Sequence, residues 1–123
     1  DPTKASTIVM KYMQKYGFKV YPVNPLAKGK KILGEEVFAK LTEINKPVDI
    51  VDVFRPSKEA LDIAKDTVSI GAKVLWLQLG IKSEEARKIV EKDNIEYVDD
   101  RCTKMEYQKH FLKVRQAFPV LQD

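Results

Sequence analysis

Apolar positions along the chain form short runs and helical stripes, and one run lies at the centre of this pattern. Between Gly71 and Gly80 the positions 74–77 and 79 are all large and apolar, without the alternation of a half-exposed strand. Such a run is typical of a strand that is buried on both faces in the middle of a parallel sheet. Gln78 and Gly80 follow where this strand ends, at the rim where open α/β sheets bind ligands.

Further strands and helices are predicted from the same kind of pattern. Strands are expected over residues 18–23, 48–54 and 95–98, and Asp49 and Asp52 favour a position nearer the sheet edge for the second of them. Helices are expected from Ser6, as an N-cap, to Gly17, over 35–41, from 57 to Gly71 and from 83 onward. A last helix is expected over about 104–117, because Thr103 and Glu106 have capping-box spacing.

The predicted strands and helices alternate to the end of the chain. This order favours a single α/β domain over residues 1–123, with a doubly wound, mostly parallel, Rossmann-like sheet. The chain starts at Asp1 with a helix and no strand before it, although the first strand of such folds lies in the middle of the sheet. We therefore expect either that the first strand is missing ahead of Asp1 or that another segment or chain fills its place.

Composition narrows the classes of function. The 22 basic and 18 acidic residues are intermingled and give a net charge of +4, which suits a phosphate-bearing small ligand. There is no basic stripe with interleaved aromatic residues, so we expect no nucleic-acid partner. No apolar run approaches the roughly 20 residues needed to cross a bilayer, so no membrane partner is expected. The single cysteine, Cys102, excludes an internal disulfide and favours a cytoplasmic location.

Catalytic and metal-binding patterns are poorly represented. His110 is the only histidine and is more easily explained by packing than by chemistry. Asp99 and Asp100 are neighbours on an extended segment, where adjacent side chains point apart. No nucleophile elbow, Walker loop or metal-spaced Cys/His set occurs, so we predict neither catalytic nor metal-ligating residues.

Ligand binding has more support, because four predicted strands end in polar turns. These turns are residues 23–25, 53–55, 78–80 and 99–102, and parallel strands would bring them to one rim. Each of them could also be an ordinary loop start. The first helix is expected to add free backbone N–H groups at Ser6, Thr7 and Ile8, with the cation Lys4 beside them, which together can hold a pyrophosphate.

Several motifs in series resemble the small bacterial and archaeal CoA-binding proteins. These motifs are Tyr-Pro-Val-Asn-Pro at 21–25, Ile-Leu-Gly at 32–34, Val-Asp-Ile-Val-Asp-Val-Phe-Arg at 48–55, the stretch 70–80 and Asp-Arg-Cys at 100–102. The family is a stand-alone form of the Rossmann-type domain that opens the succinyl-CoA synthetase alpha subunit. The resemblance covers residues 2–106 and departs at Thr103, where the family usually has proline.

The resemblance implies a five-stranded parallel sheet that binds coenzyme A or an acyl-CoA without established catalysis. It implies three groups of binding residues. Ser6 and Thr7 would lie under the pyrophosphate, Asn24, Pro25 and Lys30 along the adenosine and its phosphates, and Val53, Phe54 and Arg55 along the adenine or pantetheine path. It also implies a contribution from Gln78 of the central strand.

Two other readings stay open at this point. One is an enzyme with a nucleotide cofactor, either an NAD-type oxidoreductase or an acyl-CoA transforming activity, because dinucleotide-binding folds host many reactions. Asn24 argues against NAD, since an acidic residue for the ribose is expected there. The other reading is a regulatory protein whose ligand tunes the binding of a protein partner that the sequence does not name. Cys102 is either a structural thiol or a thiol able to form a mixed disulfide with CoA.

Overall fold

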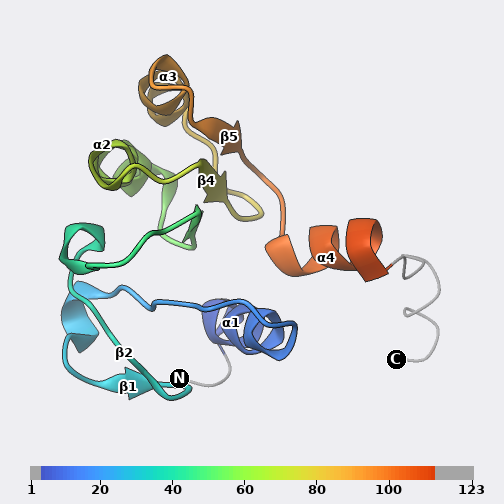
Figure 1. Cartoon of the computed structure of the whole chain (residues 1–123). Helices are drawn as coiled ribbons and strands as arrows, with labels where there is room; N and C mark the ends of the chain where they lie inside the picture. The colour runs from blue at the N-terminus through green and yellow to red at the C-terminus, as the bar shows by residue number, and fades with distance from the viewer. Residues whose placement is uncertain (1–3, 113–123) are drawn as a thin grey trace.

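The computed structural model describes residues 4–112 and shows a parallel sheet with helices on both sides (Figure 1). Strands β3 (Ile50–Val53), β4 (Val74–Leu77) and β5 (Glu96–Val98) pair in parallel, in the order β3-β4-β5. Helix α2 (Ala60–Ile70) connects the first two strands and α3 (Glu84–Lys92) connects the last two. The predicted alternation of strands and helices, with the strand at 74–77 in the centre of this sheet, is therefore confirmed for this part of the chain.

One face of the sheet forms the main core. The side chains of Leu75 and Leu77 on β4 are fully buried against Ala64 of α2 and Val90 of α3. Alanines at the helix contacts allow both helices to approach the sheet closely. Val74 and Trp76 point to the other face and are only partly buried, so the prediction of a strand buried on both faces is wrong.

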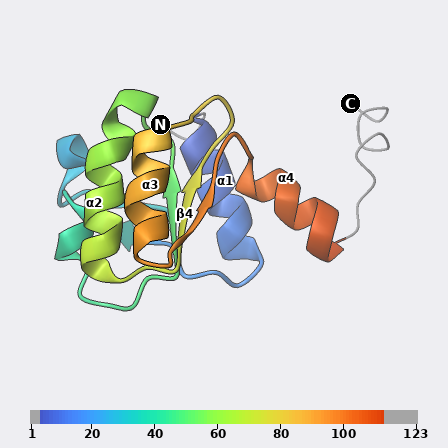
Figure 2. The same ribbon diagram turned by 90° about the horizontal axis from the view of Figure 1, so that it is seen from above.

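Helices α1 (Ala5–Lys15) and α4 (Thr103–Tyr107) lie on the other side of the sheet from α2 and α3 (Figure 2). A π-helical turn, Gln108–Leu112, continues α4. The two helices contact each other through a cluster of aromatic rings made by Tyr12, Tyr16, Phe18 and Tyr107. The predicted end of the last helix lies outside the described residues. No helix within them has the length and apolar character needed to span a bilayer.

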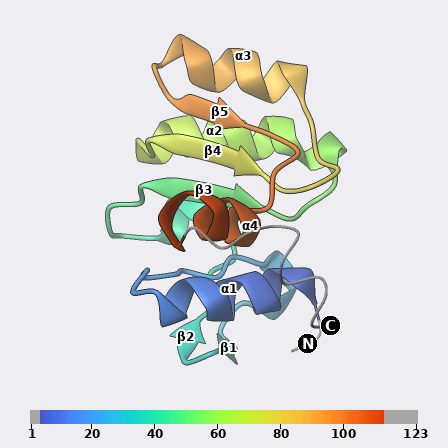
Figure 3. The ribbon, with the colours of Figure 1, turned by 90° about the vertical axis from the view of Figure 1, so that its right-hand side faces the viewer.

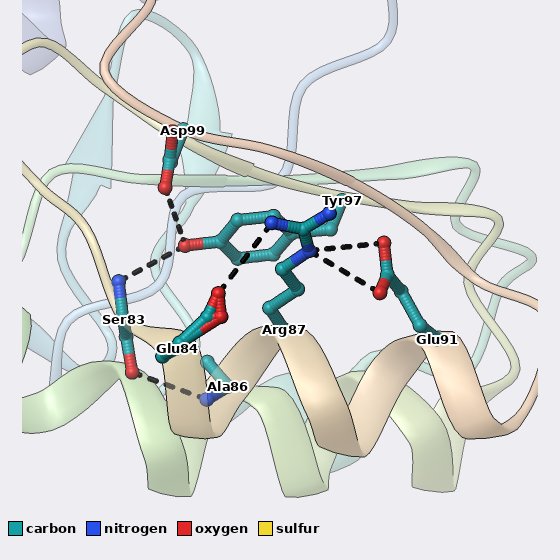
Figure 4. Close-up of polar contacts among 7 residues, drawn as sticks. All are labelled: Ser83, Glu84, Ala86, Arg87, Glu91, Tyr97 and Asp99. Carbon is teal, nitrogen blue, oxygen red and sulfur yellow. Dashed lines mark hydrogen bonds and ion pairs between the residues drawn. The ribbon is translucent and has the colours of Figure 1, made fainter.

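Helix α3 shows how local sequence sets an element boundary. The Ser83 hydroxyl accepts a hydrogen bond of 3.1 Å from the backbone N–H of Ala86, as predicted for an N-cap. The Ser83 N–H donates in turn to the Tyr97 hydroxyl at 2.9 Å, which ties the start of α3 to β5 (Figure 4). On the helix surface Arg87 forms an ion pair with Glu91. Burial raises the pKa of Tyr97 to about 12, so its hydroxyl remains protonated.

The segment 18–23 does not form the predicted strand. Only Val23 makes a bridge, to Phe38, through backbone bonds that also involve Pro22 and Asn24. The segment is extended, but no strand lies beside it among residues 4–112, and an extended backbone needs a ladder partner to become a strand. Figure 3 shows it running apart from β3, whose one strand partner in the described part of the chain is β4.

The predicted short helix over 35–41 is a hairpin instead. Strands β1 (Lys31–Ile32) and β2 (Glu35–Glu36) pair antiparallel around Leu33 and Gly34. Both turn residues have positive φ, 50° and 83°, which is the geometry of a two-residue type I′ turn. The turn therefore overrides the weak helical pattern of the residues that follow it.

Two predicted helix caps are also wrong. Helix α1 begins at Ala5 with Lys4 as its N-cap, so Ser6 lies inside the first turn and caps nothing. At α4 the N-cap is Cys102, and the hydroxyl of Thr103 is directed to a buried carboxylate rather than to the helix backbone.

Candidate functional site

The loops that follow β3, β4 and β5 meet at one end of the sheet. The arrowheads of the three strands point to the same side in Figure 3, and the amino end of α1 lies on that side too. The Gly80 N–H donates to Asp100 Oδ1 at 2.8 Å, and the Gln78 N–H donates to the Val53 carbonyl at 3.1 Å. Three of the four turns predicted to share a rim are thus joined by hydrogen bonds.

A buried polar cluster links these three loops. Gln78 is 5% exposed, and its Nε2 donates to Asp52 Oδ1 of β3 and to Thr103 Oγ1 at 2.9 Å. The Thr103 hydroxyl donates to the other oxygen, Asp52 Oδ2, at 2.9 Å. The amide N–H groups of Gln78 are therefore used inside the protein, and its role is to hold the ends of β3, β4 and α4 together.

Asp52 is the titratable group of this cluster. Burial raises the pKa of its carboxyl to about 6, and the two hydrogen bonds from Gln78 and Thr103 offset part of that effect. The carboxylate accepts both bonds only in its ionised form. A group with this pKa changes charge at mildly acidic pH, so the cluster can respond to pH.

The indole of Trp76 adds a further link at the same end of the sheet. Its Nε1–H donates to the Arg101 carbonyl at 2.7 Å. The backbone of the segment after β5 is therefore attached to the side chain of a β4 residue on the face away from the main core. This bond fixes where the residues 100–102 lie relative to the strand ends.

The amino end of α1 has the features of an anion site. Its first internal bond joins the Ile8 N–H to the Lys4 carbonyl at 3.1 Å, so the N–H groups of Ala5, Ser6 and Thr7 have no acceptor within the helix. The N-cap makes no side-chain bond and the first turn carries no acidic residue. The positive end of the helix dipole is therefore not neutralised by the helix itself.

The turn predicted to run along the adenosine is partly used by local contacts. Asn24 Oδ1 accepts a hydrogen bond of 2.9 Å from the Leu26 N–H and caps a short 3-10 turn, Pro25–Ala27. Pro25 and Lys30 are exposed. Their contact with a ligand stays a prediction, and the side-chain oxygen of Asn24 is already occupied.

The three residues predicted to line the adenine or pantetheine path face different ways. The side chain of Val53 is 4% exposed and belongs to the main core, so only its backbone can meet a ligand. Phe54 is partly buried. The Arg55 guanidinium forms two bonds of 3.0 Å with the carboxylate of Glu59, on the surface. Of the three, Phe54 has the side chain best placed to contact a ligand.

A hollow of about 290 Å³ lies beside the ends of β4 and β5. It is lined by Leu79, Asp100, Arg101, Cys102, Met105, Glu106 and Lys109. Leu79 is 60% exposed, directly after the strand end, and Cys102 carries a free thiol. Sequence reasoning placed Leu79 in the turn 78–80 without giving its side chain a role, and it missed Met105 and Lys109. The available signals were an apolar side chain immediately after a strand and the helical spacing of 102, 105 and 109.

Within the described range of the chain, no group of three His, Cys, Asp or Glu side chains is arranged to hold a metal ion. The site offers backbone amides, nearby cations and a hollow with Leu79 and Met105 in its wall, and groups of these kinds bind a phosphorylated ligand with an apolar arm.

Comparison with known proteins agrees with this chemistry. A family model described as CoA binding domain matches residues 1–108. The uncharacterized protein YneT of Bacillus subtilis is 35% identical over 104 residues, which cover 85% of this chain and 76% of that protein. A Thermus thermophilus structure is 36% identical with a TM-score of 0.87 and covers 90% of this chain and 83% of its own.

A larger protein contains the same fold. The dinucleotide-forming acetyl-coenzyme A synthetase 1 of Ca. Korarchaeum cryptofilum is 25% identical with a TM-score of 0.63. The match covers 80% of this chain and 23% of the synthetase. The extent of the family match and the similarity to YneT lead to one conclusion: this chain belongs to the CoA binding domain family.

Proposed function

We propose that this protein binds coenzyme A or an acyl-CoA at the rim formed by the ends of β3, β4 and β5 and the amino end of α1. The observation that carries the proposal is the amino end of α1, whose first N–H groups have no acceptor within the helix and which lies on the same side as the strand ends (Figure 3). Phosphates bind well at such helix ends because several N–H donors and the helix dipole act together. The family and the match to part of an acetyl-CoA synthetase support the choice of CoA as the ligand.

In this proposal different parts of the CoA molecule contact different parts of the rim. The backbone N–H groups of Ser6 and Thr7, together with that of Ala5 before them and with Lys4, hold the pyrophosphate. Residues 24–25 and Lys30 lie along the adenosine and its phosphate. Phe54 covers a flat or apolar part of the ligand, while Gln78 acts indirectly by fixing the strand ends. The apolar wall of the hollow near Leu79 receives the pantetheine arm.

The proposed function is that of a binding or regulatory module located in the cytoplasm. The supporting observation is the chemistry of the rim, which offers backbone donors and apolar side chains. The hydroxyl–carboxylate pair of Thr103 and Asp52 is bonded to Gln78 and holds the strand ends together. The alternative function, an NAD-type oxidoreductase, requires binding of NAD, which is therefore one of the ligands in the titration below.

We also propose that the sheet has five strands in the complete binding site. Among residues 4–112, one edge of β3 has no ladder partner, and the segment 18–23 makes a bridge at Val23 alone. One parallel strand between them would pair with both. That strand would come from outside the residues that the structure describes, and the turn after it would lie next to the amino end of α1.

Calorimetric titration with CoA, acetyl-CoA, ADP and NAD tests the ligand. We expect micromolar binding of CoA or acetyl-CoA, weaker binding of ADP and none of NAD. Absence of binding of both CoA species at millimolar concentration would refute the proposal. Tighter binding of NAD than of CoA would favour the oxidoreductase reading instead.

The substitution Ala5→Pro tests the phosphate position. Ala5 is the first residue of α1 and follows Lys4, whose φ of −67° and ψ of 145° suit a residue before proline. Proline there keeps the helix but removes one N–H donor, so affinity for CoA should fall about tenfold, the cost of one charge-assisted bond. The control Ala5→Ser retains the N–H and should bind normally. Equal affinity of the two variants would place the phosphates elsewhere.

A further inference from the structure

A second surface feature lies on α1, along its length rather than at its amino end. Ile8, Lys11, Tyr12 and Lys15 are spaced at helical intervals and form one stripe of the helix. Together with Lys104 of α4 they line a hollow of about 370 Å³, which we call the α1–α4 groove. The groove shares no residue with the hollow beside β4 and β5.

The floor of the groove is apolar and its rim is cationic. Ile8 is 47% exposed although it is aliphatic, and the partly buried ring of Tyr12 lies below the Lys104 ammonium, 5.3 Å from Nζ to ring centroid. The Lys15 Nζ lies 5.6 Å from the centroid of the Tyr16 ring. The lysine stems thus extend over aromatic surface, while their charged ends remain accessible to a partner.

The positive charge of this groove is not balanced by the described part of the chain. Six other basic residues, together with His110, account for the ion pairs found between residues 4 and 110, and none of these pairs includes Lys11, Lys15 or Lys104. Lys104 lies at the amino end of α4, where a cation does not stabilise a helix. Three cations around one apolar hollow are therefore not explained by folding alone.

We propose that the α1–α4 groove binds an acidic amphipathic segment of a partner protein. An apolar side chain of that segment enters the hollow over Ile8 and Tyr12, and carboxylates on either side pair with Lys11, Lys15 and Lys104. Charge complementarity selects this occupant, because the groove presents cations and no carboxylate. RNA is a poorer fit, since stacking would need open aromatic faces and the ring of Tyr12 is partly buried beneath Lys104.

A membrane surface is also a poorer fit, because the apolar part of the site is a hollow rather than a protruding face. The proposal goes beyond CoA binding and does not depend on it. The groove uses the side-chain stripe of α1, whereas the proposed phosphate position uses the backbone at its amino end.

The test measures binding of a fluorescent synthetic peptide with leucines at helical spacing and flanking glutamates. The first variant is Lys11→Glu/Lys15→Glu, which reverses two exposed charges four residues apart on α1. The matched control is Lys88→Glu/Lys92→Glu, which reverses two exposed charges four residues apart on α3. Circular dichroism checks that both variants fold, and CoA titration checks that the strand-end site is unchanged.

We expect the α1 variant to lose at least about tenfold in peptide affinity and the α3 variant to bind as the parent does. Saturating CoA should leave peptide binding unchanged. The proposal is overturned if the peptide does not bind, if both variants weaken it equally, or if CoA displaces it. It is equally overturned if a uridine oligonucleotide or phosphatidylserine vesicles bind at Lys11 and Lys15 while the peptide does not.

Discussion

The carboxyl of Asp52 makes a quantitative prediction about stability and pH. Its pKa is about 6 in the folded protein against 3.8 for the unperturbed group, so the folded state holds this proton more tightly than the unfolded chain. Because the folded pKa is raised, the stability that protonation adds is fully present below pH 3.8 and is lost as pH rises through 6. A difference of about two pKa units corresponds to about 3 kcal/mol.

The substitution Asp52→Asn removes this titration while keeping the side-chain shape. It also turns one acceptor toward Gln78 or Thr103 into a donor, which adds a cost of about 1–3 kcal/mol that does not depend on pH. The informative quantity is therefore the change with pH in the difference between variant and parent. Relative to the parent, the variant should gain about 2 kcal/mol between pH 4 and pH 7.

Urea unfolding followed by far-UV circular dichroism, repeated at several pH values from 4 to 7.5, measures this difference. The control Asp49→Asn removes a carboxylate from the same region of the chain, but from a side chain that is 75% exposed. The reasoning about burial at Asp52 would be refuted if the stability of Asp52→Asn relative to the parent stayed constant between pH 4 and pH 7, or if it decreased as pH rises.

Three further substitutions test the fold. Leu75→Ala should lower the free energy of unfolding by about 3 kcal/mol, because the side chain is 0% exposed. Its control, Leu26→Ala, should change this free energy by less than about 0.5 kcal/mol, because Leu26 is 89% exposed. Urea unfolding of both variants measures the difference. Leu33→Asn should raise the free energy of unfolding by about 0.5–1 kcal/mol, since asparagine tolerates the positive φ of this turn. An unchanged urea midpoint would argue against the I′ geometry. Ser83→Ala should cost about 1 kcal/mol through loss of the bond from the Ala86 N–H, and thermal melting with no shift would show that the cap is not needed.

The central part of the fold could be predicted from the sequence because apolar runs and helix signals agree there. The runs at 50–53 and 74–77 are too apolar to be surface segments, and Ser83 and Gly71 bound their helices as expected. These are local signals. The position of the more polar run nearer the sheet edge was also predicted, and in the three-stranded sheet it lies at the edge.

The predictions that were wrong concern parts of the fold that depend on contacts between residues far apart in the sequence. Asp52 was treated only as an interruption of a strand, yet it bonds to Gln78, 26 positions away, and to Thr103, 51 positions away. The same bond removes Thr103 from its expected capping role. The segment 18–23 has strand-like composition, but composition cannot supply the neighbouring strand that a ladder needs.

The bond between the Trp76 indole and the Arg101 carbonyl gives the protein an optical reporter of its own. Trp76 is the single tryptophan of the chain, so its emission reflects one location. A ligand that displaces the backbone at 100–102 would alter the polarity around the ring and shift that emission. Occupation of the strand ends can thus be followed without any label attached to the protein.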